Sequence, residues 1–345
     1  MATPQSVPRT VGSLGDDVVI TFRTELSRIS GRLVRLGAVA DTILARHKIP
    51  EPALAELGEA LSLSALLGSA LPGEGKIIVQ TSTDGPVTFL VADYEAPGRI
   101  RGYARFNKDK MAASAAVQPN TGDPKPAGQP RLLGARLLGV GHLAITIETG
   151  PTAERYQGVV ALDGGPLADG AERYFEQSEA LPTFVRLAVA RLFQSGAGTP
   201  ASSWHWRGGG IMLQHVQGAQ DGDEAVLPGH TPPGPRGETD EDWVRVRTLA
   251  ETIEDHELLD PTLTPERLLL RLFHEEGVVI LNVQPLEAYC RCSRNRVFDV
   301  LQSFGATQLS DMHDDNGRIT ATCEFCATTY DFDPAEFSDI NVKPE

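Results

Sequence analysis

Four cysteines near the end of the chain constrain its fold more than any other feature of the sequence. The 345 residues contain four cysteines in all, and these form two close pairs, Cys290-Arg-Cys292 and Cys323-Glu-Phe-Cys326, separated by thirty residues. Each pair can supply two thiolates from one tight turn, and the chain between them can fold back to complete a tetrahedral site. The spacing therefore predicts one zinc ion bound by Cys290, Cys292, Cys323 and Cys326.

The same cysteines predict sensitivity to oxidants. Thiolates are the form of cysteine that oxidants attack, and each pair is close enough in sequence to form a disulfide within itself. Zinc supplies the folding free energy of such small units, so oxidation, zinc release and local unfolding would be one coupled event. Arg291, Arg294 and Arg296 lie beside the first pair. They either offset the negative charge of the thiolates or are ordinary solvated side chains, and both readings stay open.

The distribution of charge divides the chain in two. Residues 1–220 contain 21 Lys and Arg against 20 Asp and Glu, whereas residues 221–345 contain 10 against 26. A duplex nucleic acid would be repelled by the acidic part, because binding to phosphates needs an excess of Lys and Arg. The sequence has no run of about 18 apolar residues and no apolar secretory segment at its start. We therefore expect neither a nucleic-acid nor a membrane partner, and a cytoplasmic location.

The hydrophobic pattern of residues 1–220 predicts a mixed α+β domain with an antiparallel sheet of several hairpins. Asp84-Gly85 lies between two β-rich runs, which is a strong hairpin signal. Three glycines, residues 208–210, are expected to bend or bulge a strand. The predicted strands are 18–22, the two arms of the hairpin, 99–106, 142–149, 155–163, 184–193 and 206–216. The predicted helices are 25–48, 52–71 and 166–178.

Three domains are expected from these patterns: an α+β core at 1–219, an acidic, metastable linker at 220–286, and a small four-cysteine zinc domain at 287–345. Within the linker, residues 243–257 and 264–276 have helical spacing but little apolar surface, so neither helix should be stable alone. Adjacent Glu275 and Glu276 are assigned to a solvated face.

The chain resembles a known family, the redox-regulated heat-shock chaperone called the 33-kDa chaperonin, over nearly its whole length. The resemblance rests first on the two cysteine pairs and on the helix RLLLRLFHEEGV at 267–278. Recurring segments of the first domain are also similar, namely TDGP at 83–86, ERYQGVV at 154–160, YFEQSEALPT at 174–183 and GGIMLQ at 209–214. The chain departs from the family pattern at 110–130, which is expected to be a flexible surface insertion, and at 220–241.

The resemblance implies an ATP-independent holdase, which is not an enzyme. In such a protein the reduced cysteines bind zinc and the chaperone is inactive. Oxidants would convert Cys290–Cys292 and Cys323–Cys326 to two disulfides, release zinc and unfold the adjoining linker. The active form would be a homodimer that binds unfolding client proteins and prevents their aggregation.

Two other functions fit parts of the pattern. A zinc-ribbon module could bind a partner protein with a purely structural metal. Alternatively, Cys323 and Cys326 could form the active site of a thiol oxidoreductase, but that reading requires a thioredoxin-like βαβ context, and the second cysteine pair favours zinc.

Overall fold

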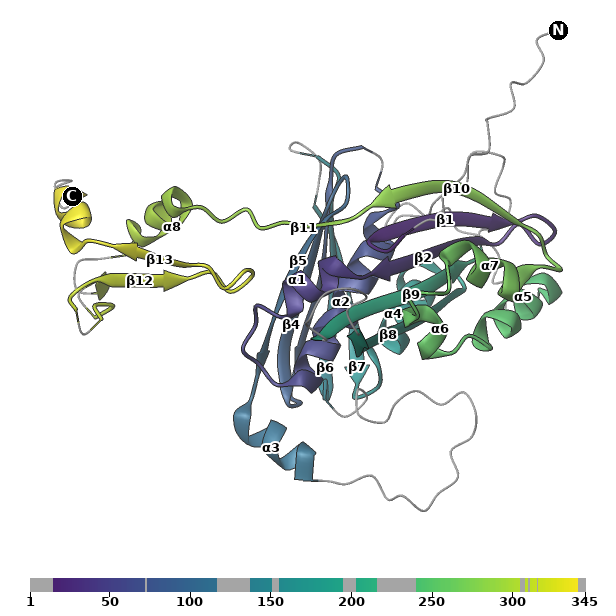
Figure 1. Ribbon diagram of the computed structural model, residues 1–345, viewed down its shortest axis with the longest axis horizontal. Coiled ribbons are helices and arrows are strands. Elements are labelled where there is room, and N and C mark those ends of the chain that lie inside the picture. Colours follow the sequence, from purple (N-terminus) through teal and green to yellow (C-terminus); the bar gives the residue numbers. More distant parts are fainter. Residues whose placement is uncertain are drawn as a thin grey trace, which may run out of the picture.

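Two β-sheets with a buried helix between them form the core of the molecule (Figure 1). The computed structural model describes residues 15–71, 73–116, 137–150, 155–194, 203–215, 240–304, 308–309, 311–314 and 316–340. A small unit that carries the cysteines extends from one side of this core and is joined to it by a short strand, β11. The architecture confirms the predicted α+β class.

The first sheet has the strand order β10-β1-β2-β9-β8, with all neighbours antiparallel. Its strands are β1 (Val18–Thr24), β2 (Ser30–Leu36), β8 (Thr183–Gln194), β9 (Ser203–Gln214) and β10 (Val278–Pro285). The second sheet has the order β11-β5-β4-β3-β6-β7, in which only β11 runs parallel to its neighbour. Its strands are β3 (Lys76–Thr83), β4 (Val87–Glu95), β5 (Arg99–Phe106), β6 (Val140–Glu148), β7 (Arg155–Asp163) and β11 (Glu287–Ala288).

Helix α2 (Glu51–Gly68) lies between the two sheets and contacts strands of both. Pro52 occupies its first turn, where a missing N–H costs nothing. From Ala60 to Gly68 every residue is buried, because a helix covered on both sides needs apolar or small side chains all round. The predicted helix 52–71 is thus confirmed, and it forms the centre of the larger hydrophobic cluster.

The predicted helix over 25–48 is wrong. The structure has strand β2 there, followed after Gly37 by the short helix α1 (Ala38–Leu44). Both faces of β2 are buried: Leu33 packs on one side of the first sheet and Val34 on the other. A strand buried on both faces loses the apolar–polar alternation, and its apolar residues then also satisfy helical spacing.

Most other sequence predictions for the core are confirmed. The Asp84-Gly85 turn joins β3 to β4, the four later strands appear as β6 to β9, and the helix at 166–178 is α4 (Leu167–Glu179). The predicted flexible segment 110–130 begins instead with a helix, α3 (Lys108–Ala116), and residues 117–136 lie outside the described part. Most of the predicted insertion at 220–241 also lies outside the described residues.

Three helices of the acidic segment cover the outer face of the first sheet (Figure 1). They are α5 (Glu241–Glu251), α6 (Asp255–Leu259) and α7 (Pro265–Phe273). Helix α7 alone buries Leu268, Leu269, Leu272 and Phe273 against this face. Each such side chain contributes about 1.5–3 kcal/mol when buried, so the sheet supplies the packing that short helices lack alone. The segment thus belongs structurally to the core, and its low stability stays a prediction.

Two buried arginines of the first sheet hold the chain around α6. Arg35 donates hydrogen bonds to the carbonyl oxygens of Leu263 (3.1 Å) and Asp260, and Arg207 donates to that of Leu259 (2.7 Å). Asp16 lies 2.6 Å from Arg207 and offsets its charge. Charge-assisted bonds of this kind orient a loop more firmly than apolar contact does.

The three glycines of β9 neither bend nor bulge the strand, contrary to expectation. Their pairing with β2 and β8 is continuous, without a shift of register. A Cβ atom on Gly209 would lie 2.7 Å from the carbonyl oxygen of Leu258. Glycine is therefore needed because α6 approaches the sheet backbone closely.

The prediction that Glu275 and Glu276 lie on a solvent-exposed face is confirmed for Glu275 and wrong for Glu276, whose side chain is 3 % exposed. Glu276 accepts hydrogen bonds from Nε of Arg245 (2.5 Å) and from the hydroxyl of Ser27. The bond from Arg245 is the main reason that the pKa of Glu276 is lowered. This carboxylate fastens α5 and the end of α7 to the turn between β1 and β2.

None of the helices in the described part of the chain is both long and apolar enough to span a membrane.

Candidate metal centre

The four cysteine sulfurs converge in the unit formed by residues 289–340, called the cysteine unit below. All four Sγ atoms lie within 4.8 Å of one another. Cys290 Sγ is 3.7 Å from Cys323 Sγ, and Cys292 Sγ is 3.2 Å from Cys326 Sγ. A tetrahedral site with metal–sulfur bonds of about 2.3 Å has sulfur–sulfur edges of about 3.8 Å. The donor set and its spacing therefore fit one thiolate-bound metal ion.

Two local structures place these sulfurs. Cys290 and Cys292 lie in the segment between β11 and helix α8 (Arg294–Leu301), whose N-cap is the hydroxyl of Ser293. Cys323 and Cys326 lie in the turn of a hairpin between β12 (Ile319–Thr322) and β13 (Thr329–Phe332). Hydrogen bonds from Cys323 N to Thr328 O (2.9 Å) and from Ala327 N to Cys323 O (2.8 Å) close this turn.

The surroundings of the sulfurs shift their pKa values in opposite directions. Burial, with the neighbouring cysteines, raises the pKa of Cys292 to about 12 even though the Tyr330 hydroxyl donates to its sulfur (3.2 Å). Burial would also raise the pKa of Cys326, but hydrogen bonding with Thr328 and contact with Cys292 lower it to about 7. The two sulfurs therefore differ in how readily they ionise, and burial is the main cause of the raised pKa at Cys292.

The cysteine unit has a small apolar core of its own. Among the described residues it consists of five buried side chains, which come from α8, position 309, the β12–β13 hairpin and η2 (Pro334–Ile340): Leu301, Leu309, Ile319, Phe332 and Phe337. So few buried side chains rarely stabilise a domain of this size, and natural domains then depend on a metal or on disulfides. The four sulfurs are therefore placed where a bound ion would hold the unit together.

The turn that carries Cys323 and Cys326 also contacts the second sheet of the core. The ring of Phe325 packs edge-on against Tyr103 of β5, with centroids 4.8 Å apart, and the guanidinium of Arg101 lies 3.9 Å from its centroid. Glu324 accepts hydrogen bonds from Nε (3.1 Å) and Nη2 (3.0 Å) of Arg105. The two residues between the cysteines thus form an interface between the metal centre and β5.

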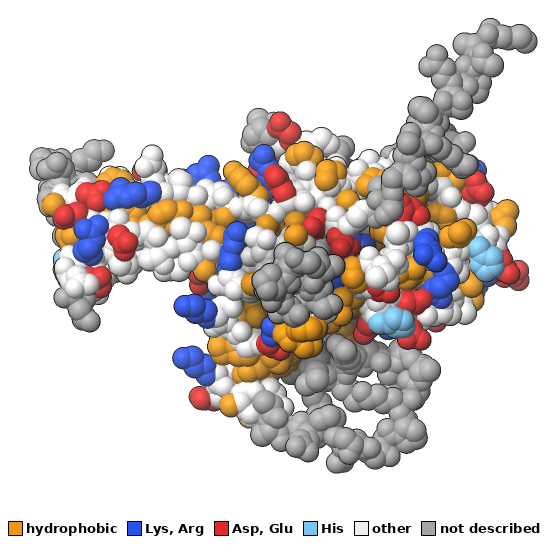
Figure 2. All heavy atoms as spheres, viewed as in Figure 1, with side chains coloured by type: hydrophobic (Ala, Val, Ile, Leu, Met, Phe, Trp, Pro, Cys, Tyr) orange, Lys and Arg blue, Asp and Glu red, His pale blue; other side chains and the backbone are white. Residues whose placement is uncertain are grey.

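One basic residue of the core, Arg101, lies beside the sulfur of Cys290. Burial alone would lower the pKa of Arg101, but its hydrogen bonds to Asp93 and Cys290 raise it. Arg291 instead pairs with Asp93 (3.7 Å) and Glu95 (3.5 Å) of β4. Figure 2 shows acidic and basic side chains mixed on this face of the cysteine unit.

The other two arginines considered from sequence face the unit itself. Arg294 pairs with Glu336 (2.8 Å), and Arg296 donates to the carbonyl oxygen of Arg291 (2.7 Å). Arg101 could not be identified from the sequence, because no local pattern connects it with Cys290, about 190 positions later. The one sequence feature that pointed to Arg101 was the alternating placement of arginines along the strand RIRGYARF.

We expect Phe325→Ala to loosen the docking of the cysteine unit without removing its metal, since all four sulfurs remain. Loss of one aromatic pair and one cation–π contact should weaken docking by about 1–3 kcal/mol. Hydrogen exchange of β5 amides should then accelerate while the metal content stays unchanged. Phe193→Ala, which removes an exposed ring from β8, is the matched control. Unchanged β5 exchange in the Phe325 variant would contradict the interface.

Comparison with known proteins identifies the family. A family model described as Hsp33 protein matches residues 17–333, which is most of the chain. The chain belongs to the Hsp33 family. It is 44% identical over 322 residues to a 33 kDa chaperonin of Caulobacter vibrioides (strain NA1000 / CB15N), with 92% of this chain and 95% of that protein covered. It is 32% identical over 325 residues to that of Proteus mirabilis (strain HI4320), with 94% and 96% covered.

The fold agrees with this assignment. The crystal structure of the 33 kDa chaperonin from Thermotoga maritima superposes with a TM-score of 0.69 at 20% identity, covering 94% of this chain and 97% of that chain. As a member of the Hsp33 family this protein has a chaperone function, as the resemblance implied. Its four cysteines are positioned to bind a metal ion.

Proposed function

We propose that this protein is a redox-regulated, ATP-independent holdase of the cytoplasm. In the reduced state Cys290, Cys292, Cys323 and Cys326 bind one Zn²⁺ ion and the chaperone is inactive. Oxidation forms the disulfides Cys290–Cys292 and Cys323–Cys326, zinc leaves, and the adjoining segment unfolds. The oxidised form, a homodimer, binds unfolding clients and prevents their aggregation, and no nucleic acid, membrane or catalytic reaction is involved.

The observation that carries this proposal is the position of the four sulfurs. They join two parts of a unit whose own apolar core is small. Bound zinc supplies about 10–16 kcal/mol of folding free energy in units of this kind. Its loss therefore removes the main support of the unit, and four thiolates are the preferred ligand set for a structural zinc ion.

Oxidation by peroxide balances within each pair. Two thiols lose two electrons and two protons, one S–S bond forms, and one peroxide molecule becomes two water molecules. Both sulfur contacts short enough for hydrogen bonds join cysteines of different pairs, Cys290 with Cys323 and Cys292 with Cys326. Pairing each cysteine with its sequence neighbour therefore separates the two halves of the site. This links the chemistry to opening of the unit.

Opening of the unit would be transmitted to the core at two places. The Cys323–Cys326 turn contacts β5 through Phe325, and the segment before Cys290 continues from β10 and β11, which are edge strands of the two sheets. An edge strand has a partner on one side only and is held by fewer hydrogen bonds than an inner strand. Loss of the docked unit is thus expected to release β11 first, then β10 and the helices α5 to α7.

The test is a metal titration of the reduced protein with a zinc-binding dye. We expect one zinc per chain, released in proportion to the loss of free thiols when peroxide is added under mildly destabilising conditions. Peptide mass mapping should show disulfides within the two pairs. Zinc that stays bound after all four thiols are lost, or its absence from reduced protein, would contradict the switch. Metal that resists peroxide altogether would favour the interaction module with a structural metal.

A further inference from the structure

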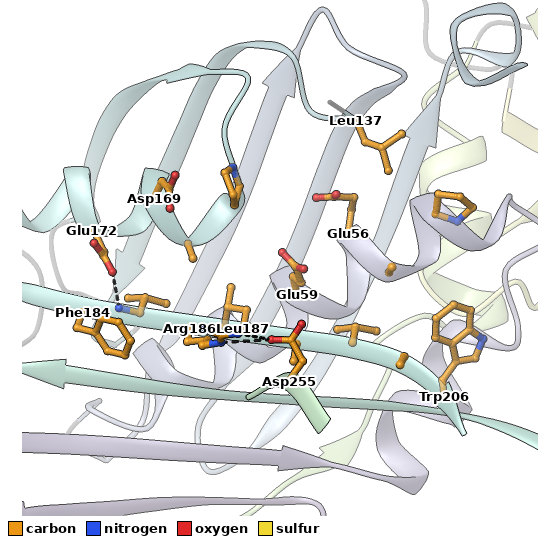
Figure 3. Close-up of a pocket in the computed structure, with 18 of the residues that line it drawn as sticks. Glu56, Glu59, Leu137, Asp169, Glu172, Phe184, Arg186, Leu187, Trp206 and Asp255 are labelled. Atoms are coloured by element: carbon orange, nitrogen blue, oxygen red, sulfur yellow. Dashed lines mark hydrogen bonds and ion pairs between the residues drawn. The ribbon is translucent and has the colours of Figure 1, made fainter. Parts of the chain in front are cut away.

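A cavity of about 950 Å³ runs along the outer edge of β8 (Figure 3). Eight consecutive residues of this strand, 184–191, line it. The remaining walls come from α2, from α4 and the residue before it, from the ends of α5 and α6, and from Leu137 and Trp206. At about 3.4 Å per residue the lined stretch of strand is about 27 Å long. The cavity is therefore an elongated groove, called the β8 groove below.

The backbone of β8 presents hydrogen-bonding groups to this groove. Among the described strands, β8 is the last of the first sheet and pairs only with β9. The N–H of Val185 points outward and donates to Glu172 of α4 (2.8 Å). Residues two apart in a strand direct their backbone N–H and C=O groups to the same edge. The backbone groups of Leu187 and Val189 therefore also point outward, as those of Val185 do. In the described part of the chain, no hydrogen bond beyond the regular ladders involves the backbone of these two residues.

The groove carries an excess of negative charge. Seven carboxylate side chains and three arginines line it. Arg186 is paired with Asp255 (2.8 Å), and Arg191 with Glu51. Glu56 of α2 is 2 % exposed, and within the described part of the chain its Oε2 atom has no hydrogen-bond partner. Figure 3 shows Glu56 and Glu59 projecting from α2 into the space beside β8.

Glu56 is the feature that most requires a ligand. Burial first, and then the neighbouring charge of Glu59, raise the pKa of Glu56 well above its ordinary value. A buried carboxyl group without a partner costs free energy, and a cationic side chain beside it would remove that cost. Within the described part of the chain, the groove thus lacks a positive charge beside Glu56 and hydrogen-bond partners for the outward backbone groups of Leu187 and Val189.

Two other occupants fit less well. Among the described residues, the cysteines form the only group of three or more His, Cys, Asp or Glu side chains close enough to hold a metal ion. No three carboxylates of the groove therefore lie close enough together to share one cation. A second copy of the chain, paired edge to edge through β8, would bring two acidic linings together, and like charges disfavour that pairing.

We propose that the β8 groove binds an extended segment of a non-native polypeptide as an additional strand on β8, with a Lys or Arg side chain of that segment beside Glu56. Main-chain hydrogen bonds supply affinity that does not depend on sequence, which suits a chaperone with many clients. The inference rests on the chaperone function. A single strand in this groove is a weak contact, and holding a whole client also requires the surface that oxidation releases.

The experiment measures binding of fluorescein-labelled nonapeptides to the full-length reduced protein by fluorescence anisotropy. The probe peptide alternates Val and Thr around a central Lys, and a matched peptide has Glu at that position. A third peptide keeps the Lys but is N-methylated at alternate amides, which prevents strand pairing. We expect the first peptide to bind at least about tenfold more tightly than either of the others, equivalent to about 1.4 kcal/mol. Equal affinity of the wild-type protein for all three peptides would overturn the proposal, so this test needs no protein variant.

Protein variants locate the site. The double variant Glu56→Gln, Glu59→Gln should lose the preference for Lys over Glu, whereas Glu275→Gln, an exposed acid elsewhere, should keep it. Bound peptide should also slow hydrogen exchange of the Leu187 and Val189 amides. Retention of the preference in the double variant, or unchanged exchange, would exclude this groove. If the oxidised wild-type protein still suppresses client aggregation in that case, the groove fails while the chaperone function stands.

Discussion

Oxidised, zinc-free protein is expected to suppress the light scattering of a thermally unfolding client without ATP, whereas reduced, zinc-bound protein is not. Zinc supplies about 10–16 kcal/mol to units of this kind, and moving a two-state equilibrium from 1:99 to 99:1 needs about 5.5 kcal/mol. Removal of the metal should therefore change the population of the opened form almost completely. The contrast between the two states, measured side by side, is the largest effect that this structure predicts.

Two controls accompany the assay. Oxidised protein that is returned to reductant and zinc should lose its activity, which excludes irreversible damage as the cause of suppression. Phe325→Ala in the reduced state should show a small activity, because its docking contact with Tyr103 and Arg101 is lost while its metal is kept. Equal suppression by oxidised and reduced wild-type protein would leave a chaperone without redox control.

Cys323→Ser is expected to abolish tight metal binding and unfold the cysteine unit. Outer partners of metal ligands alone typically contribute 10- to 100-fold to affinity, so loss of a ligand should cost more than about 100-fold. The β12–β13 hairpin should lose its hydrogen-exchange protection, because the remaining core has five buried side chains. The folded core should be retained, since its two main hydrophobic clusters contain none of these residues.

The matched control for this variant is Tyr330→Phe. It removes the hydroxyl that donates to Cys292 but leaves all four sulfurs in place. Its metal affinity should fall by no more than about 100-fold, as expected for an outer partner. Unchanged zinc affinity in Cys323→Ser would show that this cysteine is not a ligand, and equal losses in both variants would show that folding of the hairpin, rather than coordination, limits binding.

The clustering of the four cysteines could be predicted because its information is local. Cysteine pairs one and two residues apart bring sulfurs together within single turns, so the four positions were recognisable without any knowledge of the core. The Asp84-Gly85 hairpin was predictable for the same reason. Hydrophobic periodicity failed to predict strand β2, both faces of which are buried. A strand covered on both faces does not alternate apolar and polar residues.

The sequence by itself determined the four-cysteine cluster, the acidic character of the last third, and most of the strands and helices. The tertiary structure alone decided what these parts contact. Only the packing shows that Phe325 lies against Arg101 and Tyr103, that Glu276 is buried beside Arg245, and that α2 brings Glu56 to the free edge of β8. These residues are distant in sequence, and their contacts follow from strand order and register, which hydrophobic periodicity and local propensity do not encode.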